Sequence, residues 1–235
     1  TFLNQLAARP HTEKEILDFL HHLAESLDFL HKQEVLHGGL GVDTIAIDSN
    51  GYPLVFDFGL SGVFKKLLLE NMDEGFENLS VGSVKCTSPE QILGRAPTRA
   101  SDIYTYGILS YFVVFGELPF DGQYVPETAV SHFSDGIVQT VEMPLGVSRE
   151  TLKFIQKCIQ RNPEARFLSF SEVLKNLERM LSGRKVRVRF EKRMDIQRYP
   201  IRFPLSRSFA VVTIFILGLL GSSFLYIRDS HAAQQ

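Results

Sequence analysis

The sequence predicts a mainly helical α+β domain with one small β-hairpin, followed by one transmembrane helix. Three observations predict this arrangement: an amphipathic helix pattern after Thr12, an Asn50–Gly51 pair between two strand-like segments, and an uncharged run over residues 208–227. The hydrophobic fraction of 44% is ordinary for a protein with a buried core. A net charge of −2 gives no general attraction to nucleic acid, so no such partner is expected.

The first helix is marked at its start by a capping box, with Thr12 at the N-cap and Glu15 three residues later. Apolar residues then recur at helical spacing as Ile16, Leu20, Leu23, Leu27 and Leu30. We therefore expect a helix with one apolar face that runs to about His31.

A hairpin and further helices follow. The segments TIAID and YPLVF predict two short strands, and the Asn50–Gly51 pair between them is a strong hairpin-turn signal. Residues 101–115, SDIYTYGILSYFVVF, are almost wholly apolar, which predicts a helix buried on all sides. Two more helices are expected over residues 149–161 and 171–181.

Residues 208–227 form a run of 20 residues without a charge, long enough as a helix to span about 30 Å of hydrocarbon. Basic residues crowd positions 184–207 before it, which predicts that residues 1–207 face the cytosol. We expect a single-pass, tail-anchored protein in the endoplasmic reticulum or endomembranes rather than the mitochondrial outer membrane. The stretch 184–193 is interpreted as a linker on anionic lipid heads, with an edge strand as the alternative.

The stretch HGGLGVDTIAID, residues 37–48, raises the question of function. Its glycines, Gly38, Gly39 and Gly41, have the composition of a phosphate-binding loop. Such a loop follows a strand and opens a helix, whereas here a helix precedes the glycines and a strand follows them. The order of elements therefore argues against a phosphate cradle.

HGGLGVDTI, DFG at residues 57–59, SPE at 88–90, SDIYTYGIL and NPEARFLSF occur in the order and spacing of a known family. Together they resemble the C-terminal lobe of a eukaryotic protein kinase. We therefore divide the chain into a kinase-like domain (1–181), a basic juxtamembrane linker (182–207), the transmembrane helix (208–227) and a short tail (228–235). The Gly-rich loop, lysine and glutamate of the family's N-terminal lobe would precede Thr1.

The resemblance implies that the catalytic side chains are missing. Gly39 stands where the family has its catalytic aspartate, and Gly41 stands where a lysine contacts the transferred phosphate. Thr44 replaces the asparagine that holds a second magnesium ion, and Gly38 replaces an arginine that receives activation-loop phosphate. Because loss of one acid–base group typically costs about 10²–10⁴-fold in rate, we expect little or no phosphotransfer, as in a pseudokinase.

Other positions keep the residues that hold such a lobe together. The resemblance assigns His37 and Phe58 to an internal apolar column and Asp102 to hydrogen bonds with the backbone of the catalytic loop. It assigns Glu90 and Arg166 to a buried ion pair. These groups would maintain the architecture and perform no chemistry.

Asp57, followed by Phe58 and Gly59, is the candidate cofactor or metal ligand. It would bind magnesium weakly or make only a local hydrogen bond, since a magnesium site usually also needs nucleotide phosphates. No cofactor is therefore expected. Four histidines, His21, His22, His31 and His37, cluster in the sequence, but their spacing indicates surface histidines on a helix rather than a metal site.

The expected function is that of a membrane-anchored, catalytically inactive kinase-like domain acting as a binding or regulatory scaffold. Its partner would be a protein, such as an active kinase or its substrate, and residues 184–207 and 208–227 would contact lipid. The alternative is an active or weakly active Ser/Thr kinase, using ATP and magnesium, whose N-terminal lobe lies upstream.

Overall fold

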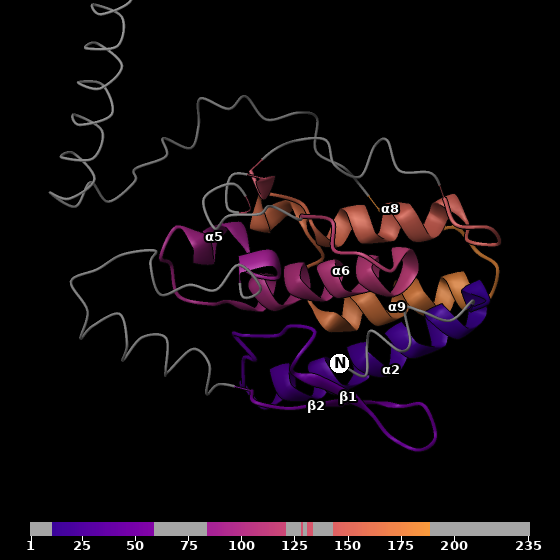
Figure 1. Cartoon of the computed structure of the whole chain (residues 1–235), viewed down its shortest axis with the longest axis horizontal. Helices are drawn as coiled ribbons and strands as arrows, with labels where there is room; N and C mark the ends of the chain where they lie inside the picture. Colours follow the sequence, from indigo (N-terminus) through magenta and orange to yellow (C-terminus); the bar gives the residue numbers. More distant parts are fainter. Residues whose placement is uncertain (1–10, 59–83, 121–127, 129–130, 134–142, 189–235) are drawn as a thin grey trace, which may run out of the picture. The chain divides into compact units, whose positions relative to one another are not determined.

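Helices make up most of the described chain, together with one two-stranded antiparallel sheet (Figure 1). The computed structural model describes residues 11–58, 84–120, 128, 131–133 and 143–188. In chain order the elements are α2 (Glu13–Lys32), β1 (Ile45–Ile47), β2 (Pro53–Val55), α5 (Pro89–Ile92), α6 (Arg99–Phe115), α8 (Arg149–Cys158), the 3₁₀ helix η2 (Pro163–Ala165) and α9 (Phe170–Leu181). The prediction of a mainly helical fold with a small hairpin is confirmed.

Helix α2 begins at the predicted capping box. The Oγ1 atom of Thr12 accepts the N–H of Glu15 at 3.3 Å, and Oε2 of Glu15 accepts the N–H of Thr12 at 2.8 Å. The helix ends at Lys32, one residue beyond the predicted end. Its apolar face packs against α9, α6 and β2, which places α2 beside the hairpin and the loop that leads to it.

The hairpin lies at the predicted place, but its strands are shorter and its loop is longer than the segments TIAID and YPLVF predicted. Ile45 pairs with Val55 and Ile47 pairs with Pro53, which leaves five residues between the strands. The Asp48 carboxylate closes this loop by accepting the N–H groups of Asn50 and Tyr52, each at 2.8 Å. A two-residue Asn–Gly turn needs positive φ at both residues, whereas here only Gly51, at +89°, has it.

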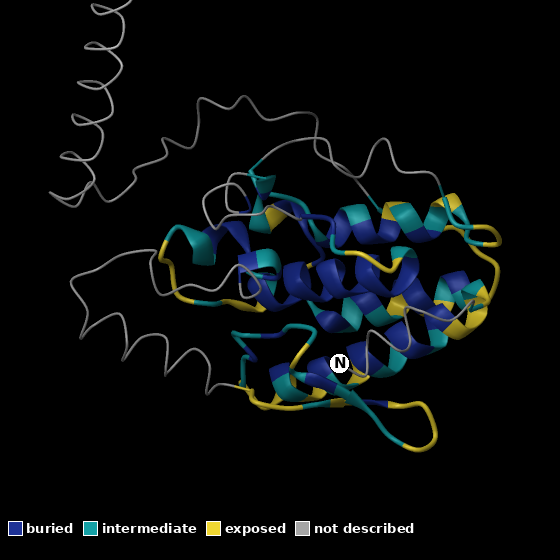
Figure 2. Ribbon diagram, viewed as in Figure 1, coloured by how far each residue is buried: buried dark blue, intermediate teal, exposed yellow. Residues whose placement is uncertain are grey.

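Helix α6 is buried along nearly its whole length, as predicted (Figure 2). It begins two residues earlier than expected because Thr98 forms a capping box with Ser101. Gly107 allows α8 to approach closely, since a Cβ at this position would lie 2.5 Å from Cβ of Cys158. The helix stops at Gly116, whose φ of 78° is in the left-handed region that favours glycine.

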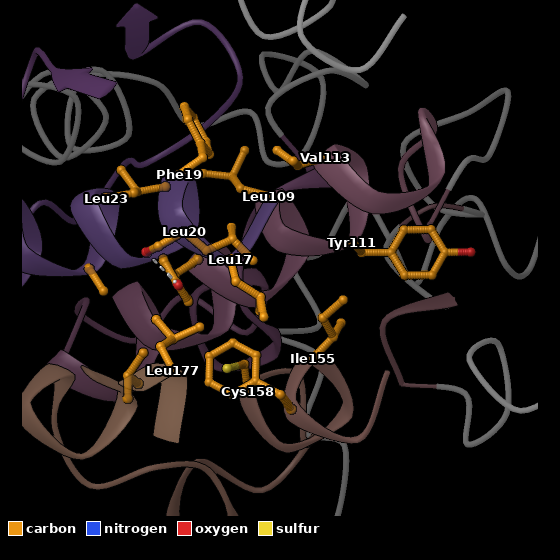
Figure 3. Packing of buried hydrophobic residues seen from close by; sticks show 14 of the residues in the cluster. Leu17, Phe19, Leu20, Leu23, Leu109, Tyr111, Val113, Ile155, Cys158 and Leu177 are labelled. Atoms are coloured by element: carbon orange, nitrogen blue, oxygen red, sulfur yellow. Dashed lines mark hydrogen bonds between the residues drawn. The ribbon is translucent and has the colours of Figure 1, made fainter. Parts of the chain in front are cut away.

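The core joins α2, α6, α8 and α9 (Figure 3). Helix α8 ends three residues before the predicted Arg161, and α9 begins one residue before the predicted Ser171. Core side chains in the close view include Leu17, Leu20 and Leu23 from α2, Leu109 from α6, Ile155 and Cys158 from α8, and Leu177 from α9. These helices form the base on which the loop over residues 37–44 rests.

The first residues of the basic stretch pack on the helices through their backbone and Val186, and the prediction that this stretch lies on lipid heads stays a prediction. Val186 is buried, and its N–H donates to Oε2 of Glu150 at 3.1 Å. The N–H of Arg187 donates to Oδ1 of Asn176 at 2.8 Å, and residues 184–188 form no strand. Among the described residues no helix is long and apolar enough to cross a bilayer, and the predicted span 208–227 lies outside them.

Candidate functional site

Asp102, in the first turn of α6, holds the backbone of the loop that follows α2. Its Oδ2 accepts the N–H of His37 at 2.9 Å, and its Oδ1 accepts the N–H of Gly38 at 2.8 Å. The Nε2 atom of His31 lies 2.9 Å from Oδ2 of the same carboxylate. Asp102 is 2% exposed, so these three partners offset the loss of water around a buried carboxylate.

Two histidines at this site are buried, so the prediction of a surface histidine is wrong for His31, whereas the burial of His37 is what its assignment to an internal column requires. His31 contacts Asp102 and also meets the ring of Phe170 edge-on at a centroid distance of 5.0 Å. His37 is wholly buried, and neither of its ring nitrogens has a hydrogen-bond partner among the described residues. Burial lowers the pKa of His37, although the charge of Asp102 opposes this effect. His37 therefore occupies a buried position under the loop.

Gly38 stands where the family has an arginine, and its neighbours leave little space for a side chain. Its φ is +70°, and a Cβ there would lie 3.1 Å from Cγ of Pro97. Its carbonyl oxygen accepts a hydrogen bond from Nε2 of Gln91 at 2.9 Å, and Oε1 of Gln91 in turn accepts one from Ser88 at 2.9 Å. The segment over residues 91–97 thus takes up the space beside Gly38 and its carbonyl oxygen, while the N–H of Gly38 donates to Asp102.

Sequence reasoning did not single out Gln91 or Pro97. Gln91 is 53 residues from Gly38 in the chain, so no local pattern relates the two. The contact arises only because α5 and the loop both rest on the start of α6.

Thr44 and Gly41 close the loop on itself. The N–H of Gly41 donates to Oγ1 of Thr44 at 2.9 Å, and the Thr44 hydroxyl donates to the carbonyl oxygen of Gly41 at 3.0 Å. A Cβ at Gly41 would meet nothing within 4 Å, so the missing lysine leaves open space. Gly39, between these residues and Gly38, contributes only backbone groups.

Asp57 and Phe58 follow β2 and face solvent. Asp57 is exposed, and its φ of 60° is uncommon for a non-glycine residue. Phe58 is 48% exposed, so the prediction that it fills an internal column with His37 is wrong for this structure. A phenyl ring stays buried only where other side chains cover it, and the described residues leave half of this one uncovered. Gly59 lies outside the described residues.

The Glu90–Arg166 pair joins α5 to the segment after η2. Nη1 and Nη2 of Arg166 contact the two carboxylate oxygens of Glu90 at 2.8 and 2.9 Å, in a bidentate arrangement. Arg166 also donates to the carbonyl oxygens of Ala100 and Gln160, each at 2.7 Å. Burial alone raises the pKa of Glu90, but Arg166 outweighs it and holds this pKa below the ordinary value.

The arrangement keeps the exposed Asp57 carboxylate, which is able to hold a cation. Positions 39 and 41 supply neither a carboxylate nor a positive charge. The Thr44 hydroxyl is committed to Gly41. The buried polar groups at His31, Asp102, Glu90 and Arg166 link elements to one another and do not face solvent.

The profile of the protein kinase domain matches residues 2–177. A probable serine/threonine-protein kinase of Clostridium acetobutylicum is 28% identical over 163 residues, which are 69% of this chain and 24% of that protein. PrkC of Bacillus subtilis, a serine/threonine-protein kinase, is 25% identical over 184 residues, 78% of this chain and 27% of PrkC. PknB of Mycobacterium tuberculosis, another such kinase, is 25% identical over 175 residues, 74% of this chain and 27% of PknB.

The chain spans about a quarter of the length of these curated relatives. The family profile covers most of the chain. The helices and strands of the chain follow one another in the order that the resemblance implied. The chain belongs to the protein kinase domain family.

Proposed function

We propose that this chain is a catalytically inactive kinase domain that acts as a binding or regulatory scaffold at a membrane. The observation that carries the proposal is the glycine at position 39, where the family has its catalytic aspartate. Phosphotransfer needs a carboxylate to accept the proton of the substrate hydroxyl, and metal ions to offset charge on the phosphates. Gly39 supplies no carboxylate, and the hydroxyl of Thr44 is hydrogen-bonded to the backbone of Gly41.

The contacts that hold the lobe together support a binding role. Asp102 still fixes the loop backbone, and Glu90 still pairs with Arg166. Three apolar side chains at alternate positions along β2 and its two flanking residues are also 45–50% exposed: Tyr52, Leu54 and Phe56. Because side chains at alternate positions of a strand lie on one face, these three form an exposed apolar face that suits contact with a protein partner such as an active kinase or its substrate.

A phosphotransfer assay tests the proposal. The full chain would be incubated with labelled ATP, Mg²⁺ or Mn²⁺ and a generic Ser/Thr substrate, beside the variant Asp57→Asn. We expect no incorporation above that of the variant, because the groups that position the nucleophile are missing. Incorporation that Asp57→Asn abolishes would overturn the proposal.

The second candidate is an active or weakly active Ser/Thr kinase. The names of the relatives and the retained carboxylate of Asp57 favour it. ATP and magnesium are cofactors only under this candidate. It requires that Mg²⁺ and nucleotide together raise the melting temperature of the full chain, and that Asp57→Asn removes the increase. No increase with either protein would count against it.

The membrane location is part of the same proposal. The uncharged run 208–227 and the basic residues before it support a single-pass anchor with the kinase domain in the cytosol, in the endoplasmic reticulum or endomembranes. Lipid heads would contact the basic residues of 184–207, of which Arg184, Lys185 and Arg187 have exposed side chains. Alkaline carbonate extraction of membranes tests this: the chain should stay in the pellet, whereas release into the supernatant would exclude a spanning anchor.

A further inference from the structure

We propose that His21, His22 and Glu25 of α2 form a binding site for a divalent transition-metal ion of the zinc class. This site is separate from the catalytic loop and independent of whether the domain transfers phosphate. His21 and Glu25 are four residues apart on the helix, and His22 and Glu25 are three apart, so all three side chains project from one face.

The spacing of the ligand atoms matches a tetrahedral ion. Nδ1 of His21 lies 3.6 Å from Oε2 of Glu25, and Nδ1 of His22 lies 3.0 Å from the same oxygen. One ligand atom from each of the three residues lies within 4.8 Å of the others. Zinc bonds of about 2.0–2.2 Å to nitrogen and oxygen place neighbouring ligands of a tetrahedral site roughly 3.3 Å apart. The two nitrogen–oxygen distances, 3.6 and 3.0 Å, are therefore close to the spacing that such an ion requires.

Neighbouring groups orient both imidazoles. The other ring nitrogen of His21, Nε2, lies 4.0 Å from a carboxylate oxygen of Glu178 on α9. Metal-bound histidines commonly direct their second ring nitrogen at a carboxylate, which fixes the ring and the tautomer. The ring of His22 meets Tyr52 edge-on, with the centroids 4.5 Å apart. Residues of the hairpin and of α9 therefore lie beside the two rings.

Access and ligand type favour a transition metal over a simple surface ion pair. The side chain of Glu25 is 53% exposed, so an ion reaches the cluster from solvent and water completes its coordination. Two imidazole nitrogens converge on one carboxylate oxygen, an arrangement that a single cation satisfies at once. Imidazole nitrogens select zinc, copper or nickel over magnesium or calcium. Both cysteines are buried, and burial raises the pKa of each thiol, so neither competes for the ion.

Isothermal titration of the full, tag-free chain with zinc chloride tests the site, with Co²⁺ absorption as a second readout. We expect one ion per chain, and binding at least about 10-fold weaker in His21→Ala/His22→Ala and in Glu25→Gln. Glu178→Gln should weaken zinc binding by about 10-fold, because it removes the carboxylate beside the second ring nitrogen of His21 and leaves the three ligands in place. The control His11→Ala removes a histidine that precedes α2 and lies ten residues before His21, and it should bind zinc as the parent does.

Circular dichroism of each variant checks that the fold is kept. Glu25→Gln changes only an exposed group, so it keeps the test decisive if the double histidine variant unfolds. Binding that is equal in the parent, Glu25→Gln and His21→Ala/His22→Ala would overturn the proposal, as would an absence of one-to-one binding by the parent.

Discussion

The Thr44 hydroxyl closes the catalytic loop on Gly41, accepting its N–H at 2.9 Å and donating to its carbonyl oxygen at 3.0 Å. At the position where the family carries a magnesium-binding amide, this chain has a side chain that stabilises its own loop. The loop thus keeps a defined conformation after the loss of its catalytic groups.

Thr44→Ala should lower the free energy of unfolding by about 1–2 kcal/mol, since it removes both hydrogen bonds with the Gly41 backbone. Thr44→Ser keeps the hydroxyl, so its free energy of unfolding should fall much less. Urea unfolding of both variants, analysed as a two-state transition, measures the difference. Equal losses in the two would show that the hydroxyl contributes nothing to the loop.

Gly38→Ala and Gly41→Ala form a matched pair in the same loop. Gly38→Ala should destabilise by about 1–2 kcal/mol, because φ is +70° and the new Cβ would lie 3.1 Å from Pro97. Gly41→Ala meets nothing within 4 Å and should be neutral or slightly stabilising. Adding Pro97→Ala to Gly38→Ala should restore only the part of the lost stability that comes from the close contact with Pro97. Equal unfolding midpoints for the two single variants would contradict this account of the loop.

Asp102→Ala should destabilise the domain by about 3 kcal/mol or more. It leaves the N–H groups of His37 and Gly38 and the ring of His31 without their buried acceptor, at about 1–3 kcal/mol for each unsatisfied group. Asp43→Asn, which changes an exposed carboxylate of the same loop, should stay within about 0.5 kcal/mol of the parent. Chemical denaturation gives both values. A loss as small for Asp102→Ala as for Asp43→Asn would exclude Asp102 as the anchor of the loop.

The Glu90–Arg166 pair predicts a pH dependence. Burial alone raises the pKa of Glu90, but the hydrogen bonds and charge of Arg166 hold it below its ordinary value of 4.5. A lowered pKa in the folded state means that the stabilisation is fully present above 4.5 and is lost as the pH falls through the folded pKa. The free energy of unfolding of the parent should therefore fall more steeply below that pH than that of Glu90→Gln.

At neutral pH, Glu90→Gln should cost about 3–5 kcal/mol, because it leaves a buried guanidinium without its counter-charge. Other carboxylates with lowered pKa values, Glu13 and Asp28, are present in both proteins and cancel in the comparison. Urea unfolding over a pH series measures both effects. Identical slopes for the parent and Glu90→Gln would show that the pair does not set the acid sensitivity.

Local patterns predicted the elements well, because each depends on residues that are close in the chain. The capping box at Thr12 fixed the start of α2, and the apolar run of α6 indicated its burial. The predicted strands were too long, since Asp48 closes a five-residue loop where only the three residues 49–51 were expected between the strands. The start of α6 was missed although Thr98 and Ser101 have capping-box spacing.

The site was predictable only where the family resemblance supplied long-range pairs. That resemblance placed Asp102 at the loop and Glu90 on Arg166, as the structure has them. It gave no indication that His31 binds Asp102 from 71 residues away, nor that Pro97 packs against Gly38. Such contacts depend on how helices pack, which a single sequence does not encode in any local pattern. For the same reason, the exposure of Phe58 was not foreseen.

The central claim is that the loop keeps its structure and has lost its catalytic groups. The rate of phosphate transfer tests this claim most directly. The full chain and the kinase PknB would be measured side by side under single-turnover conditions with labelled ATP and Mg²⁺. The account predicts a rate at least about 10²-fold below that of PknB and unchanged by Asp57→Asn, because Gly39 supplies no carboxylate. A rate within about 10-fold of PknB that depends on Asp57 would contradict it.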